Sequence, residues 1–315
     1  MPTEGRSGQK LHPSVRFFSK KEKRMKQSFG KSLLLLFLSL FGPTMTAAVK
    51  VVYQRSDSLK VVRLVAQGRK LKAADRPVYF GRQFLGVPYV AATLEGHDPE
   101  CLVVNLRQLD CTTLVENVAA LTWACQERGD AWKNYIKYLE RLRYKDGRLN
   151  GYASRLHYFT EWMSDNTRRK LVVPVNAGAV ASASFAPVLS YMSTHPMAYP
   201  MLKKHPEWVS VIARNEKQFS GIRVNYIPRD KLNGGRSTLG AIRNGDIVAI
   251  VTRRKGLDYS HVGLAVWGKD GKLHLLNASS LRKKVVEEPQ TLYRYMLGQR
   301  NQMGIRLVRL ACCVN

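Results

Sequence analysis

Acidic residues are scarce in this sequence. Its 315 residues include 23 Asp and Glu against 51 Lys and Arg, which gives a formal net charge of +28. Such a balance predicts attraction to polyanions such as nucleic acid, lipopolysaccharide, teichoic acid or an anionic membrane surface. Basic stretches interleaved with aromatic residues, typical of RNA-binding proteins, are lacking, so we expect no nucleic-acid partner. The sequence implies no stable protein partner either.

Cysteine is also sparse and irregularly spaced. The five cysteines form no CxxC pair, and Cys and His nowhere cluster at ligand spacing, so we expect neither a metal site nor another cofactor. An odd number leaves at least one thiol unpaired within the chain. The spacing leaves open a bridge from Cys312 or Cys313 to Cys101 or Cys125.

No apolar run reaches the roughly 20 residues that a membrane-spanning helix needs. The run at 32–41 is shorter, follows a basic segment and precedes small residues at 46–48, which is the pattern of a signal peptide. We therefore predict a basic leader and signal peptide over 1–48, cleavage near Ala48, and an exported protein in the periplasm or cell envelope. An uncleaved amphipathic anchor is the alternative. The lack of a cysteine soon after the run argues against a lipoprotein.

Hydrophobic periodicity predicts helices first and an antiparallel sheet afterwards. A poorly defined lead-in covers 49–74, in which 49–65 is a candidate strand pair. Helical spacing of apolar residues then recurs over 77–85, 111–126, 131–144, 152–163 and 205–219. Short apolar runs divided by turn signals predict strands over 102–106, 246–252, 260–267, 272–277, 285–287 and 304–310, with one more helix over 291–299. This order predicts a single α+β domain over 75–315.

The first chemical candidate is Cys111, at the predicted start of a buried helix. Leu114, Val115 and Val118 follow it at helical spacing. A helix N-terminus presents unpaired N–H groups and the positive end of the helix dipole, and both favour a nucleophilic thiolate. The alternative is an inert packing residue, because free cysteine is among the most buried residue types.

His261 and Asn277 complete a candidate catalytic set. His261 stands near the start of a predicted strand, where an imidazole can accept the thiol proton and return it to a leaving amine. Asn277 ends the next strand, where its amide can orient the imidazole, as in a Cys-His-Asn arrangement. His274 ranks second for this role, because three residues along a strand place it on the opposite face. The alternatives are a satisfied structural histidine and an ordinary strand-end amide.

Several motifs, in their order and spacing, resemble the NlpC-type cell-wall cysteine hydrolases: GVPY at 86–89, DCT at 110–112, NGDIV at 244–248, SHVGL at 260–264 and NASS at 277–280. Longer segments resemble more closely the bacterial N-acetylmuramoyl-L-alanine amidase-like subfamily: PYVA at 88–91, VVNLR at 103–107, DCTTLVEN at 110–117, HYFTEW at 157–162 and GIR at 304–306. The resemblance covers roughly residues 75–310.

The resemblance implies a papain-like fold, in which a helix carrying the nucleophile packs on an antiparallel sheet carrying the base. It implies Cys111 as nucleophile, His261 as base and Asn277 as the third member, where the family usually has His. By motif position, the implied substrate-binding residues are Tyr89, Asp110, Thr112 and Ser260. In the family, an acidic residue beside the nucleophile can bind an amino group of the stem peptide, as Asp110 would.

A segment over about 128–240 is longer than a minimal NlpC-type core needs, and we expect this helical insertion to roof the cleft. Its candidate substrate contacts are Arg155, His157, Glu161 and Trp162. Aromatic residues at helical spacing are more often packing residues, which is the alternative for this segment.

The implied function is hydrolysis of the amide bond between N-acetylmuramic acid and L-alanine in peptidoglycan or muropeptides. The nearest alternative keeps the same site but cleaves between γ-D-glutamate and the diamino acid. A different class of alternative is a non-catalytic cationic envelope protein that binds anionic glycans through Lys and Arg.

Overall fold

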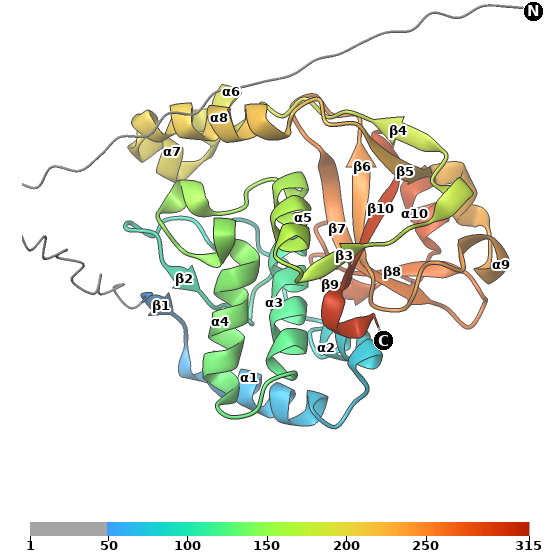
Figure 1. The fold of residues 1–315 in the computed structure, drawn as a ribbon, viewed down its shortest axis with the longest axis horizontal. Coiled ribbons are helices and arrows are strands. Elements are labelled where there is room, and N and C mark those ends of the chain that lie inside the picture. Colours follow the sequence, from blue (N-terminus) through green and yellow to red (C-terminus); the bar gives the residue numbers. More distant parts are fainter. Residues whose placement is uncertain (1–48, 315) are drawn as a thin grey trace, which may run out of the picture. The chain divides into compact units, whose positions relative to one another are not determined.

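Helices from the first half of the chain pack against a sheet formed mainly by the second half (Figure 1). The computed structural model describes residues 49–314, so the predicted leader, signal peptide and cleavage site lie outside the described residues. The predicted α+β class is confirmed. Over 49–314, no helix has the length and apolar character to cross a membrane.

The helices follow one another as α1 (Arg55–Gly68), α2 (Arg76–Arg82), α3 (Cys111–Ala124), α4 (Ala131–Arg143), α5 (Phe159–Arg168), α6 (Tyr191–Thr194), α7 (Pro200–Lys204), α8 (Val209–Phe219), α9 (Arg236–Leu239) and α10 (Leu292–Leu297). The strands are β1 (Val51–Val52), β2 (Leu102–Val103), β3 (Val172–Pro174), β4 (Ala183–Phe185), β5 (Val224–Pro228), β6 (Ile247–Thr252), β7 (Tyr259–Trp267), β8 (Leu273–Ser279), β9 (Lys284–Glu287) and β10 (Gln302–Leu310).

The large sheet has eight strands in the order β4-β5-β10-β6-β7-β8-β9, with β3 also paired to β10. Every pair in it is antiparallel. Strand β6 is buried on both faces, because Ile247 and Ala249 belong to the core on the helical side, while Val248 and Ile250 belong to a second core that includes Leu292 of α10. The strands that carry the site are therefore held from both sides.

Helix α3 joins the helical layer to the sheet. It packs against α1, α2 and α4 as well as against β7 and β8, and Val115, Ala119 and Leu121 are fully buried. Because an apolar helix enclosed in this way cannot shift without opening the core, the position of its first residue, Cys111, is fixed relative to β7 and β8.

Two local predictions are wrong. Residues 49–65 do not form a strand pair, because Val61, Leu64 and Val65 share the buried face of α1, and the helix is capped by Gln54 and Asp57. The helix predicted over 152–163 begins only at Phe159, after a short 3-10 turn, and continues through 164–166 to Arg168. In both places, the packing of side chains in the folded protein outweighs the local sequence pattern.

A third apolar cluster lies in the segment predicted to roof the cleft. It joins Tyr152 and Tyr158 to residues of α6, α7 and α8, namely Met192, Met201, Leu202 and Ile212. Glu216 of α8 ties this cluster together, because it accepts hydrogen bonds from the Tyr158 hydroxyl at 2.6 Å and from the Met192 N–H at 3.1 Å. Only the part of the segment around α6 to α8 has its own small core, because α4, α5 and β3 to β5 join the main helical layer and the large sheet.

Candidate active site

Cys111 is the first residue of α3, and two reciprocal hydrogen bonds between Asp110 and Thr113 cap the start of this helix. Asp110 accepts a hydrogen bond from the Thr113 N–H at 2.8 Å, and the Asp110 N–H donates to the Thr113 hydroxyl at 2.9 Å. The first N–H groups of a helix have no intrahelical partner. The half-buried Cys111 therefore lies where N–H groups and the helix dipole favour negative charge.

His261 of β7 faces this thiol. The strand has an irregular register at this point, since Ile250 pairs with His261 and Val251 with Tyr259, which leaves Ser260 as an extra residue. Such bulges redirect side chains and are frequent beside active sites. The imidazole hydrogen-bonds the Oδ1 of Asn277 through Nε2 at 2.9 Å, and it lines the same cavity as the Cys111 thiol.

The hydrogen bond to Asn277 determines the tautomer of His261. An amide oxygen only accepts, so Nε2 carries a proton and Nδ1 is the nitrogen available to exchange a proton with Cys111. Burial lowers the pKa of His261, but the charge and hydrogen bond of Cys111, the Asn277 contact and the charge of Glu288 outweigh it, so the pKa is raised above its ordinary value.

Asn277 is fully buried and is itself held by a residue that the sequence analysis missed. Its Nδ2 donates to Oε1 of Glu288 at 3.4 Å, and Oε2 of the buried Glu288 lies 3.7 Å from Nε of Arg282. Two consecutive acids, Glu287 and Glu288, at the end of a predicted strand were the only available signal. The structure thus brings Cys111, His261, Asn277 and Glu288 into one chain of contacts.

His274 does not reach this chain of contacts. It lies on β8 at the face opposite Asn277, where Nδ1 bonds the main-chain oxygen of Glu288 at 3.0 Å and Nε2 approaches Asp270 at 3.2 Å. The alternation of side chains along a strand therefore separates the two candidates, as the sequence predicted.

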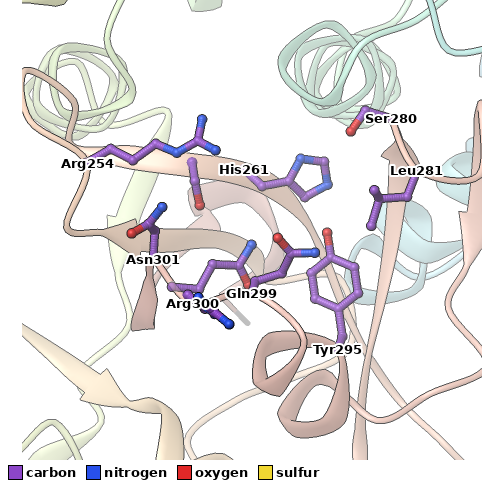
Figure 2. Close-up of a pocket in the computed structure, with 10 residues that line it drawn as sticks. Arg254, His261, Ser280, Leu281, Tyr295, Gln299, Arg300 and Asn301 are labelled. Carbon is purple, nitrogen blue, oxygen red and sulfur yellow. The ribbon is translucent and has the colours of Figure 1, made fainter.

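Two cavities meet at His261 and Ser260, which line both. The aromatic cavity, of about 190 Å³, is lined by Cys111, Thr112, His157, Tyr158, Phe159, Met192, Tyr199, Leu257, Asp258, Tyr259, Ser260, His261 and Val262. The arginine cavity, of about 290 Å³, is lined by Arg254, Ser260, His261, Ser280, Leu281, Tyr295, Gln299, Arg300, Asn301 and Gln302 (Figure 2). Met192 and Tyr199 belong to the segment predicted to roof the cleft.

Of the four motif residues near Cys111, two line the aromatic cavity, whereas Tyr89 and Asp110 line neither cavity. Thr112 and Ser260 line the aromatic cavity. Tyr89 forms an isolated bridge with Leu109, just before α3. Burial, together with the charges of Cys111 and Asp110, raises the pKa of Tyr89 to about 12, so its hydroxyl remains a donor. Asp110 uses Oδ1 for the helix cap, which leaves Oδ2 as the oxygen suited to a ligand.

The candidates in the roof segment separate into two groups. His157 lines the aromatic cavity, and burial and the nearby Arg155 charge lower its pKa to about 3, so it is neutral and donates from Nε2 to the Tyr152 carbonyl. Arg155 lines neither cavity, because its guanidinium binds Glu95 at 2.6 Å and Glu100 at 2.8 Å. Glu161 and Trp162 are also buried away from both cavities.

The cysteines form no disulfide in the described part of the chain. All five cysteines are free thiols, and the Sγ atoms of Cys312 and Cys313 are 4.0 Å apart. Over residues 49–314, no group of three or more His, Cys, Asp or Glu is arranged to hold a metal ion.

The fold and this site define a class of protein, a mixed α+β protein of the amidase type. A family model for N-acetylmuramoyl-L-alanine amidase-like proteins matches residues 79–305. The chain belongs to the N-acetylmuramoyl-L-alanine amidase-like family.

Solved structures agree with this assignment. A crystal structure of an N-acetylmuramoyl-L-alanine amidase from Bacteroides uniformis is 38% identical, with a TM-score of 0.69, covering 78% of this chain and 99% of that one. A Bacteroides fragilis protein described as a candidate xylanase is 42% identical, with a TM-score of 0.68, covering 73% and 99%. A Legionella pneumophila protein at 20% identity and a TM-score of 0.64, covering 80% and 94%, shares the fold. No protein of curated function gives a significant match.

Proposed function

We propose that this protein is a cysteine amidase that hydrolyses the bond between N-acetylmuramic acid and L-alanine in peptidoglycan or muropeptides. One observation carries the proposal: Cys111 begins a buried helix and lines the same cavity as His261, which Asn277 orients from the next strand. A nucleophile on a helix facing a base on an antiparallel sheet is the papain-like arrangement.

The first half of the reaction forms a thioester. Sγ of Cys111 attacks the lactyl carbonyl carbon while Nδ1 of His261 holds the thiol proton. The main-chain N–H of Cys111 donates to the oxyanion of the tetrahedral intermediate. The C–N bond then breaks, and His261 gives its proton to the departing amine of L-alanine, which leaves as a neutral amine.

The second half restores the enzyme. Nδ1 of His261 takes a proton from water, and the resulting hydroxide attacks the thioester carbonyl. The C–S bond breaks, the muramic acid carboxylate leaves, and the proton returns to Cys111. Asn277 holds the imidazole plane through both halves, and the raised pKa of His261 suits it to carry the proton.

The lining of the cavities supports amide rather than glycoside hydrolysis. Glycosidases use a pair of carboxylates that flank the scissile bond. Of the residues that line the two cavities, only Asp258 carries a carboxylate, and it already accepts hydrogen bonds from the Thr160 and Tyr259 N–H groups, each at 2.7 Å. The xylanase description of the Bacteroides fragilis relative therefore finds no support in this site.

A second candidate function is cleavage between γ-D-glutamate and the diamino acid by the same Cys111 and His261. Asp110 favours it, since Oδ2 and the Tyr89 hydroxyl lie at the start of α3, where a free amino group of a stem peptide can bind. We prefer the amidase because the family and the Bacteroides uniformis relative are named for that bond.

We also propose that the protein is exported. The basic, apolar and small-residue pattern of 1–48 is that of a signal peptide, and export would bring the protein to its proposed peptidoglycan substrate. N-terminal sequencing of the protein recovered from its native envelope fraction tests this. We expect a first residue at Val49. An intact Met1 in the cytoplasmic fraction would contradict export.

The experiment for function is incubation of residues 49–315 with defined muropeptides, followed by mass spectrometry. Release of the intact stem peptide from the sugar is expected. Release of a fragment that begins at the diamino acid, with L-Ala-γ-D-Glu still attached to the sugar, establishes the endopeptidase instead. If no bond is cleaved under reducing conditions across a pH range, while anionic glycans bind in a salt-dependent way, the protein is a cationic binding protein and not an enzyme.

A further inference from the structure

The arginine cavity adjoins the catalytic histidine but has a different composition from the aromatic cavity. It includes His261 and Ser260 but neither Cys111 nor Thr112. The aromatic cavity contains one carboxylate, that of Asp258, and no Lys or Arg, whereas the arginine cavity contains Arg254 and Arg300 and no acid. A substrate that reaches Cys111 and extends past His261 therefore meets positive charge on that side only.

Neither arginine is neutralised by an acidic side chain within the described part of the chain. Arg254 and Arg300 are exposed, and neither takes part in an ion pair within residues 49–314. A guanidinium binds a carboxylate through two parallel N–H groups and is the residue best suited to recognise that group. Two such groups at one cavity favour an anionic ligand.

The two arginines stand on segments that hold each other in place. The Arg253 N–H donates to the Asn301 carbonyl at 3.0 Å, and the Thr252 hydroxyl donates to the same oxygen at 3.2 Å. These bonds join the turn that carries Arg254 to the one that carries Arg300. Figure 2 shows both side chains, with His261 and Tyr295, around the same space. The backbone that carries the two arginines is therefore held in place.

A buried polar atom in the same wall needs a partner. Gln302 lines the cavity and is 7% exposed, and its Oε1 has no hydrogen-bond partner among residues 49–314. A buried amide oxygen without a donor costs free energy, which a ligand N–H recovers. The cavity thus matches a group that combines a carboxylate with a neighbouring amide N–H.

We propose that the arginine cavity binds the acidic part of the stem peptide, with Arg254 and Arg300 on the α-carboxylate of D-glutamate and Oε1 of Gln302 accepting from a peptide N–H. The inference rests on the proposed amidase function. It assigns the peptide to the arginine cavity and leaves the muramic acid to the aromatic cavity. Arg254, Arg300 and Gln302 are then specificity-determining residues.

The test compares a muramoyl peptide that has free D-glutamate with one that has D-isoglutamine, which lacks this carboxylate. For wild type we expect kcat/KM to be roughly tenfold or more higher on the acid. Arg254→Leu and Arg300→Leu should each lower kcat/KM on the acid by about tenfold, mainly through KM, and leave the amidated peptide within about twofold. Lys255→Leu, which removes the same charge from the same turn without lining this cavity, is the control and should match wild type.

An unchanged preference in both arginine variants, or an equal loss on both peptides, overturns the assignment while leaving the amidase function intact. Calorimetric binding of the same two peptides to Cys111→Ala separates the two claims, because it needs no cleavage. If wild type cleaves neither peptide but Cys111→Ala still prefers the acid in an Arg254-dependent way, the proposed function fails and the subsite stands.

Discussion

Asn277 is our proposed third member of the catalytic set, where the resemblance to NlpC-type hydrolases leads one to expect histidine, and the structure shows which residues it contacts. An amide has two chemically different ends, and only its oxygen can accept from Nε2 of His261. The Nδ2 contact with Glu288 holds the other end, so the oxygen stays turned toward the imidazole. The buried carboxylate adds the negative charge that an amide lacks.

This arrangement predicts how the pH profile responds to substitution. The Asn277 contact and the Glu288 charge both raise the pKa of His261. Removing either lowers it, so the imidazolium that protonates the leaving amine is lost at lower pH. Asn277→Ala and Glu288→Gln should therefore move the alkaline limb of kcat/KM to lower pH. Glu287→Gln, which alters the exposed pair with Arg82, is the matched control. An alkaline limb that stays in place in both variants would contradict a positioning role.

A second residue-scale prediction concerns Glu161. Burial raises its pKa to about 7, and Oε1 has no hydrogen-bond partner. Between about pH 4.5 and 7, the carboxyl keeps its proton in the folded protein but has lost it in the unfolded chain. The stability that this difference in proton binding provides is lost as the pH rises through that window. The free energy of unfolding of Glu161→Gln, relative to wild type, should therefore increase by up to about 3 kcal/mol between pH 4 and pH 8.

Urea denaturation at several pH values measures this difference. The exposed Asp230→Asn, at a residue that forms no ion pair within residues 49–314, is the control and should follow wild type across the range. A constant offset between Glu161→Gln and wild type across the range would show that Glu161 does not titrate as described.

At the scale of elements, the Asp110–Thr113 hydrogen bonds at the start of α3 cap the helix that begins at Cys111, so they contribute to the stability of the fold next to the site. Thr113→Val keeps the shape of a buried side chain but removes the hydroxyl that accepts from the Asp110 N–H and donates to the Asp110 carboxylate. We expect a loss of about 1–2 kcal/mol in the free energy of unfolding. Thr122→Val, in the same helix, removes only a bond to the Val118 carbonyl and should cost less than about 0.5 kcal/mol. Equal losses in the two variants would exclude a specific cap.

The elements that could be predicted from the sequence are those whose pattern matches their burial. Helix α3 has an apolar run from Leu114 onward, and β6 to β9 are short apolar runs divided by turns, so their positions follow from periodicity. Helix α1 was missed because its valines also suit a strand, and only packing against α3 and α4 settles the question.

The candidate site was predictable to a similar extent. Cys111, His261 and Asn277 lie in recognisable motifs, whereas Glu288 contacts the site only through Asn277, and its position depends on the register between β8 and β9. Arg155 looked like a substrate contact because its acidic partners, Glu95 and Glu100, lie far away in the sequence. Nothing local to Arg254 or Arg300 indicates that they share a cavity with His261.

At the scale of the whole molecule, charge should govern encounters with polymer. Only part of the +28 charge lies in the leader, so residues 49–315 remain strongly basic. Long-range attraction to an anionic polymer weakens as salt shortens the Debye length, to about 8 Å at 0.15 M. We expect binding of residues 49–315 to an anionic wall polymer to fall steeply between low salt and 0.5 M NaCl, while kcat/KM on a short muropeptide changes much less. If polymer binding and kcat/KM on the muropeptide depended equally on salt, the salt effect would arise mainly in the active site.

The nucleophilic role of Cys111 is the central claim, and one measurement tests it most directly. Release of stem peptide from a defined muropeptide is followed for wild type, Cys111→Ala and Cys312→Ser, the last being a half-buried thiol away from both cavities. We predict that Cys111→Ala lowers kcat by about 10⁴-fold or more, as expected when a nucleophile is removed, and that Cys312→Ser retains the wild-type rate. A Cys111→Ala enzyme that still released the stem peptide at a rate within about tenfold of wild type would contradict the account.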